Sequence, residues 1–219
     1  MISASRWIGR ICRKILADSA AISTTEFAVV LPVFMTLGMY GTEISWMTIA
    51  EMQASQVAIS LADNASRLGQ TDNSGVTPTI SDEAVQNVLT GALLEGQTMN
   101  MEDNGRVILS SLETHPVTGK QYIHWQECSG ELEKSSKHGK PDLTGTALAA
   151  TMSGLNIGGT KITAPPGTSV MVAEVWYQYH GLFGSLFVQP FTMYQEATII
   201  VRDDRNTGPG LNGKNSKGC

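Results

Sequence analysis

The stretch AAISTTEFAVVLPVFMTLGMYGT, residues 20–42, holds one charged side chain, Glu26, in 23 positions. At about 1.5 Å per residue, a helix of this length extends about 34 Å, which is enough to cross a bilayer. Three structures fit such a stretch: a cleaved secretory signal, a permanent membrane anchor, or a helix buried in a core. Neither glycine nor proline occurs between Thr42 and Leu68, so the helix is expected to continue, which favours the anchor.

The residues that follow predict an amphipathic continuation of the same helix. Apolar side chains recur every three or four positions and would form one stripe: Ala54, Val57, Ala58, Leu61, Ala65 and Leu68. Most of these side chains are small, so the helix is expected to pack closely against a sheet. Gly69 is expected to end it.

Charge predicts the orientation of the chain. Residues 1–21 contain four basic residues and one acidic residue, namely Arg6, Arg10, Arg13, Lys14 and Asp18. The remainder has 11 basic and 19 acidic residues, a net charge of −8. Basic residues beside a membrane span stay cytoplasmic, which places residues 52–219 in the periplasm of a single-pass inner-membrane protein. The acidic remainder has no basic stripe, so nucleic acid is excluded as a partner.

The rest of the chain predicts mixed helix and strand. Ser81 would cap a helix over 82–94. Strands are predicted at 106–113 and 120–127, joined as a hairpin, and at 168–180 and 194–202. Residues 129–145 are expected to form an exposed loop, and 146–152 a short helix.

The predicted fold class is therefore α+β: a long helix on an antiparallel sheet of about four strands, with a second short helix. The expected organisation is a basic cytoplasmic segment (1–19), a transmembrane helix (20–42), its amphipathic continuation (43–69), an extracytoplasmic domain (70–205) and a flexible Gly/Asn-rich tail (206–219).

The membrane helix resembles a known family. Residues 25–32, Thr-Glu-Phe-Ala-Val-Val-Leu-Pro, followed by Gly38, Gly41 and Glu43, resemble the N-terminus of TadE-like proteins. The motif residues are Glu26, Phe27, Pro32, Gly38, Gly41 and Glu43. Two later segments are loosely similar to the same family, 125–128 and 175–179.

The resemblance implies a minor pseudopilin of a tight-adherence (Flp-type) pilus system. Such a protein is not an enzyme, has a pilin-like fold, and has as partners the inner membrane, the pilus assembly machinery and other pilins or pseudopilins. Prepilins are commonly cut after a glycine five residues before the glutamate, and here that position is Ala21, followed by Ile22. Alanine is a poorer residue at such a site, so we expect no cleavage.

Each acidic residue of the motif has a functional and a plain interpretation. A carboxylate inside a membrane is functional by default, but Glu26 could also reach the headgroups from one turn inside. Glu43 is expected at the outer interface, in water, with a partner as the alternative. Gly38 with Thr42, and Gly41 with Ser45, are small residues four apart that would let another helix approach.

Enzyme chemistry finds no support in the sequence. The four histidines, His115, His124, His138 and His180, lack metal-site spacing, and neither a phosphate loop nor a nucleophile elbow occurs. Glu174 is interpreted as an exposed-face residue of its strand. We expect no catalytic residue, metal, cofactor or small-molecule substrate. The alternative function is a membrane-tethered periplasmic binding or sensor domain unrelated to pili.

The cysteines predict one disulfide. Cys12 falls in the cytoplasmic segment, where thiols stay reduced, whereas Cys128 and Cys219 fall on the oxidising side. A bond between them would close a loop of about 90 residues, worth about 4–5 kcal/mol in the chain-entropy model before the cost of ordering the tail. Two free thiols, or a bond to another subunit, are the alternatives.

Overall fold

The computed structural model describes residues 13–14, 19–69, 79–141, 152–202 and 219, and confirms the predicted α+β fold. Its helices and strands, in chain order, are α2 (Ser19–Ser66), α3 (Asp82–Glu95), η1 (Gln97–Met99), α4 (Met101–Asn104), β1 (Gly105–Thr114), β2 (Gln121–Ser129), β3 (Leu155–Ile157), β4 (Thr160–Ile162), β5 (Ser169–Tyr179) and β6 (Phe191–Ile200).

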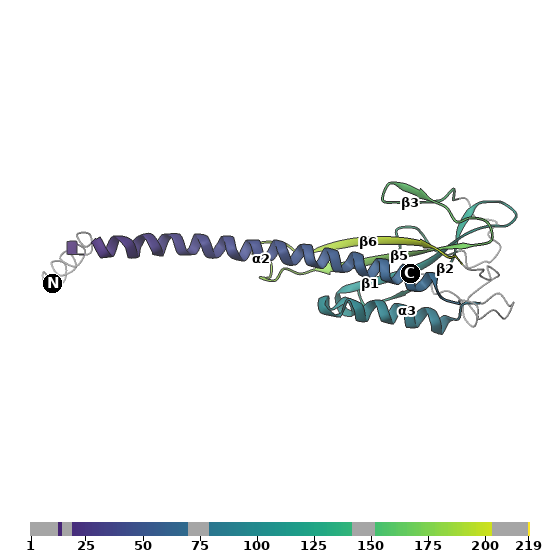
Figure 1. Cartoon of the computed structure of the whole chain (residues 1–219), viewed down its shortest axis with the longest axis horizontal. Coiled ribbons are helices and arrows are strands. Elements are labelled where there is room, and N and C mark those ends of the chain that lie inside the picture. Colours follow the sequence, from purple (N-terminus) through teal and green to yellow (C-terminus); the bar gives the residue numbers. More distant parts are fainter. Residues whose placement is uncertain (1–12, 15–18, 70–78, 142–151, 203–218) are drawn as a thin grey trace.

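Helix α2 is one continuous helix of 48 residues with two different halves. Its first half projects from the domain, and its second half lies along the sheet (Figure 1). The apolar side chains between Phe27 and Leu37 are largely exposed, whereas burial becomes regular from Ala50 onward. By length and composition the segment Ser23–Ser66 could cross a membrane.

Four antiparallel strands form the main sheet in the order β2-β1-β5-β6. The predicted hairpin joins β1 to β2, and its turn is closed by hydrogen bonds between His115 and both Lys120 and Gly119. Gly119 has φ +65°, a conformation that glycine adopts without strain. Strands β1 and β5 lie at the centre of the sheet and are almost fully buried.

The inner face of the sheet packs on α2 and α3. The predicted stripe of α2 is its contact surface: Leu68 is partly buried against the core, and the fully buried members are Ala54, Val57, Ala58, Leu61 and Ala65. Ala50 and Ala62, which the stripe did not include, are buried beside them. Because most of these are alanine, the helix approaches the sheet closely, as the small side chains predict. Helix α3 begins where expected: the Ser81 hydroxyl accepts a hydrogen bond from the Ala84 N–H at 3.2 Å.

The outer face of the sheet is also covered, which the sequence did not predict. A second apolar cluster forms where Leu112, Val170 and Val172 meet the β3–β4 hairpin. Residues 130–141 lack regular structure, as expected, but they are not a free loop. Alternate side chains from Leu132 to His138 are half-buried, and the Gly139 carbonyl accepts a hydrogen bond from Gln126. This segment therefore runs as a strap across the sheet.

Two predictions fall mostly outside the described residues. Of the predicted short helix over 146–152, the structure describes only Met152, which forms a β-bridge with Gln121. Of the tail, it describes only Cys219. That cysteine forms a disulfide with Cys128, with 6.1 Å between the two Cα atoms, and its N–H donates to the Gln126 side chain at 3.0 Å.

Peptide mapping without reductant is expected to recover the segments around Cys128 and Cys219 as one linked pair from a single chain. The same digest should contain Cys12 as a free thiol, which serves as the internal control. Free thiols at both positions in protein from the oxidising compartment would contradict the bond. A linkage between two chains would instead indicate a covalent oligomer.

Candidate functional site

The carboxylate of Glu43 lies where the two halves of α2 meet, and it is completely buried, with 0% of the residue exposed. Its Oε1 accepts hydrogen bonds from the Tyr179 hydroxyl at 2.7 Å and from the Leu182 N–H at 3.2 Å. Its Oε2 accepts one from the Phe183 N–H at 3.1 Å. The expectation that Glu43 is in water is therefore wrong: the domain itself supplies its partners.

The loop that holds Glu43 is shaped by two glycines. Strand β5 ends at Tyr179, and a turn follows in which the Gly184 N–H donates to the Gly181 carbonyl at 3.0 Å. A Cβ on Gly181 would lie 2.3 Å from the Gly184 oxygen and 2.8 Å from Glu43 Oε1, so a side chain there is excluded. The turn points two successive N–H groups at one carboxylate, the arrangement that forms backbone anion sites.

Aromatic rings surround this carboxylate site. Phe187 lies between Tyr40 of α2 and Phe183 of the loop, with ring centroids 5.9 and 6.0 Å apart. Phe191 packs on Tyr179 at 5.5 Å. Burial, with the hydrogen bond to Glu43, raises the pKa of the Tyr179 hydroxyl above its ordinary value. The hydroxyl thus remains a protonated donor at physiological pH.

The other motif residues of α2 are not brought together with Glu43. Glu26, Phe27 and Pro32 are exposed on the projecting half, with Glu26 about 25 Å from Glu43 along the helix axis. Gly38 and Gly41 are exposed too, and a Cβ on either would meet nothing within 4 Å. Their surface is thus open to another helix.

Four hydroxyl groups on α2 are satisfied within the helix itself. Each donates to the carbonyl four residues earlier at 2.7–3.0 Å, and the donors are Thr36, Thr42, Ser45 and Thr48. Such bonds allow Ser and Thr to lie in an environment without water. These hydroxyls lie in or shortly after the apolar stretch, so their bonding to the helix backbone could have been predicted from the sequence.

A second buried polar site lies on the outer face of the sheet. Glu174 and Glu196 are direct cross-strand partners on β5 and β6. The Tyr194 hydroxyl lies 3.0 Å from Glu174 Oε1 and 2.7 Å from Glu196 Oε2, so it bridges the two carboxylates. Glu174 is 0% exposed, so its interpretation as an exposed-face residue is wrong.

The strap (residues 130–141) supplies the other partners of these carboxylates. Ser136 and the Lys137 N–H donate to Glu174, while His138 Nε2 lies 3.0 Å from Glu196. The Lys137 Nζ lies 3.3 Å from the Tyr194 ring centroid, which adds a cation–π contact. Together these contacts fasten the strap to the sheet.

The protonation of this site follows from its contacts. Burial would raise the pKa of Glu196, but hydrogen bonds from Tyr194, His138 and the Gly158 N–H outweigh it, and the net effect lowers the pKa below the ordinary glutamate value. Burial, together with both carboxylates, raises the pKa of Tyr194. Glu196 is therefore ionised and Tyr194 is protonated at neutral pH.

The histidines are dispersed, as their spacing indicates. His124 lies 2.9 Å from Glu113 and His138 pairs with Glu196, whereas His115 belongs to the hairpin turn and His180 is exposed. Among the described residues, three or more side chains that could hold a metal ion do not come together.

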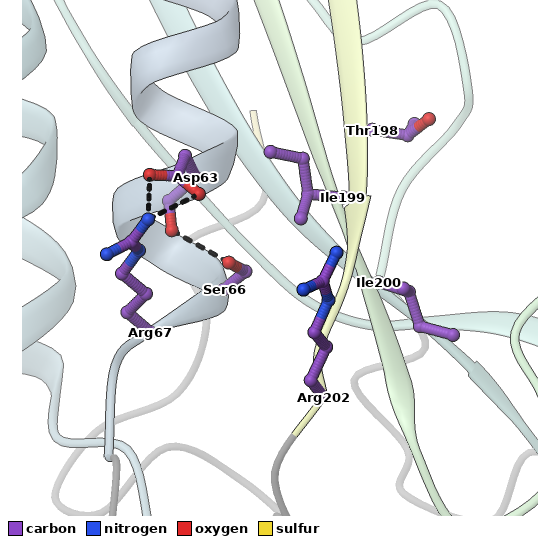
Figure 2. Close-up of a pocket in the computed structure, with 7 residues that line it drawn as sticks. All are labelled: Asp63, Ser66, Arg67, Thr198, Ile199, Ile200 and Arg202. Carbon is purple, nitrogen blue, oxygen red and sulfur yellow. Dashed lines mark hydrogen bonds and ion pairs between the residues drawn. The ribbon is translucent and has the colours of Figure 1, made fainter.

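A pocket lies at the other end of α2, against β6 (Figure 2). Its lining residues are Asp63, Ser66, Arg67, Thr198, Ile199, Ile200 and Arg202. Figure 2 shows Arg67 turned toward Asp63, with which it pairs at 2.9 Å, and Arg202 on the opposite wall. Both arginines are exposed, so the pocket is a solvated surface feature rather than a built binding centre.

Comparisons with protein-family models, curated proteins and solved structures gave no match for this chain.

We expect Tyr179→Phe and Glu43→Gln each to lower the free energy of unfolding by about 1–3 kcal/mol, because the first removes a buried charge-assisted hydrogen bond and the second replaces its charged acceptor with a neutral amide. The double variant should lose less than the sum, since both changes act on the same bond. Urea unfolding of the full chain in detergent, followed by tryptophan fluorescence, measures this. Tyr177→Phe, two residues away on the same strand face, is the control. Strict additivity would show that the two side chains are not coupled.

The outer-face site predicts a dependence on acid. A lowered pKa means that ionised Glu196 adds stability above the unfolded glutamate pKa, about 4.3, and that this contribution disappears as pH falls through the folded pKa. The difference in unfolding free energy between the unsubstituted chain and Glu196→Gln should thus be large at pH 7 and shrink below pH ~4. Tyr177→Phe, whose ring lies on the opposite face, is again the control. A difference that stayed constant down to pH ~3 would contradict the assignment.

Proposed function

We propose that this chain is a membrane-anchored, pseudopilin-like component of a bacterial tight-adherence (Flp-type) pilus system. It acts through helix and domain contacts rather than through catalysis. The observation that carries the proposal is the division of α2: one half is apolar and exposed, and the other half is the central helix of the domain. A membrane-embedded helix that continues into the core of its own domain is the arrangement expected of a pilin-like subunit.

Three features support a membrane around the projecting half. Its large apolar side chains between Phe27 and Leu37 are largely exposed, which is costly in water and favourable in lipid. The hydroxyls of Thr36 and Thr42 are satisfied by the helix backbone, so neither is an orphan in hydrocarbon. Glu43, the first charged residue after Glu26, is shielded from its surroundings because the domain buries its carboxylate and supplies three hydrogen-bond donors to it.

The basic residues before the apolar stretch support an orientation with the N-terminus in the cytoplasm and residues 52–219 in the periplasm. The disulfide between Cys128 and Cys219 is consistent with that side, because such bonds persist in oxidising compartments. With Ala21 before Ile22, the proposed protein keeps its basic segment and remains in the inner membrane.

The partners in this proposal are other membrane helices of the pilus system. Gly38 and Gly41 leave an open surface on the projecting half, which suits close helix approach in lipid. Glu26 lies on the same exposed half, where a carboxylate is best accommodated by a polar partner on a neighbouring helix or by the headgroups. These contacts would connect the chain to other pseudopilins or to the assembly machinery.

Topology and assembly test the proposal together. A periplasm-specific reporter such as alkaline phosphatase, fused after Cys219, should be active. Deleting the gene should remove surface fibres in electron micrographs, and the unsubstituted chain should restore them. Gly41→Leu, which fills the open surface, should restore fewer fibres than Val30→Leu, the control on the same half.

An active cytoplasmic reporter after Cys219 would overturn the orientation. Normal fibres in the deletion strain would overturn the pilus assignment and favour a membrane-tethered binding or sensor domain instead.

A further inference from the structure

The loop between β5 and β6 (residues 180–190, the β5–β6 loop) exposes apolar side chains to its surroundings. Leu182 is 51% exposed and Leu186 is 69% exposed, and Phe191 at the start of β6 is also exposed. From Val175 to Gln195 the sequence contains no Asp, Glu, Lys or Arg. A protruding loop that combines large apolar side chains with no formal charge is unusual for a surface in water.

This loop lies at one particular level of α2. Phe187 packs on Tyr40, and the Leu182 and Phe183 N–H groups bind Glu43. The loop is therefore fixed beside the end of the projecting half, where Leu37 and Tyr40 are themselves exposed. Figure 1 shows this end of the sheet facing the projecting half of α2. The apolar surface of the loop is thus continuous with that of the helix.

The backbone of the loop is suited to an environment with little water. An unsatisfied N–H is the main obstacle to placing an irregular segment in or near lipid. Here the N–H groups of Leu182 and Phe183 bind Glu43, and the N–H of Gly184 binds the Gly181 carbonyl. Glu43 and the Gly181 carbonyl together therefore satisfy these three donors, while the side chains of Leu182 and Leu186 remain exposed.

We propose that the β5–β6 loop inserts Leu182 and Leu186, together with Phe191 at the start of β6, into the headgroup region of the bilayer that α2 crosses. The occupant of this surface is lipid, because the loop adjoins the apolar span and apolar side chains partition into the interface. This inference rests on the proposed membrane anchoring. The domain then contacts the membrane at two points, the helix and the loop, which fixes its tilt and rotation relative to the bilayer.

Lipid quenching of single labels tests the insertion. In a full-length Cys12→Ser chain with the 128–219 disulfide kept oxidised, Leu186→Cys, Leu182→Cys, Phe34→Cys and Val117→Cys are each labelled with a bimane maleimide. The chains are reconstituted in phosphatidylcholine vesicles that carry a shallow doxyl lipid. Phe34 lies in the projecting half, and Val117, 86% exposed at the distal β1–β2 turn, is the control in water.

The expected result is quenching at 34, 182 and 186 that is at least twofold stronger than at 117. Quenching at 34 without quenching at 182 and 186 would overturn the loop insertion and leave the anchoring intact. Absence of quenching at 34 would overturn the anchoring itself. An apolar emission spectrum at 186 without lipid quenching would overturn insertion in favour of a protein partner.

Discussion

The hydrogen bonds of Glu43 fix the position of helix α2 relative to the β-sheet. A carboxylate in the long helix accepts bonds from the end of β5 and from the loop that follows, more than a hundred residues later in the chain. The interaction fixes the rotation and the axial position of α2 against the sheet at the point where packing begins. The alanine-rich contacts farther along α2 constrain its position less, because small side chains allow the helix to slide along the sheet. The three directed hydrogen bonds to Glu43 do not allow such sliding.

On the outer face of the sheet, too, buried carboxylates accept hydrogen bonds from donors elsewhere in the chain. Two glutamates opposite each other on adjacent strands would repel if both lay bare. Tyr194 bridges them, and the strap adds Ser136, Lys137 and His138. These donors offset the repulsion between the two glutamates, and the same contacts hold the strap against the sheet. The outer face of the sheet, opposite the helices, is thus covered in part by a segment that has no regular secondary structure.

The fold was largely predictable, because its main elements depend on local pattern. The length of α2, its small apolar stripe, the Ser81 cap and the four long strands all follow from spacing and residue type. The two buried carboxylate sites were not predictable, since the partners of Glu43 and Glu174 are distant in sequence and no spacing relates them. The short strands β3 and β4 have three residues each, too few for a periodic signal. One signal was available for the Glu43 site: Tyr179 followed by Gly181-Leu182-Phe183-Gly184 is an aromatic strand that runs into a glycine-bounded turn.

Helix α2 is expected to bend most easily at Pro32. Proline at position 32 has no N–H to donate to the preceding turn, so bending costs least there. It precedes Glu43 by about 16 Å of helix. From Glu43 onward the helix is clamped by the loop and the sheet. A sideways load on the domain would therefore be relieved by flexing near Pro32, and a twist applied to the helix beyond that point would be transmitted to the whole domain.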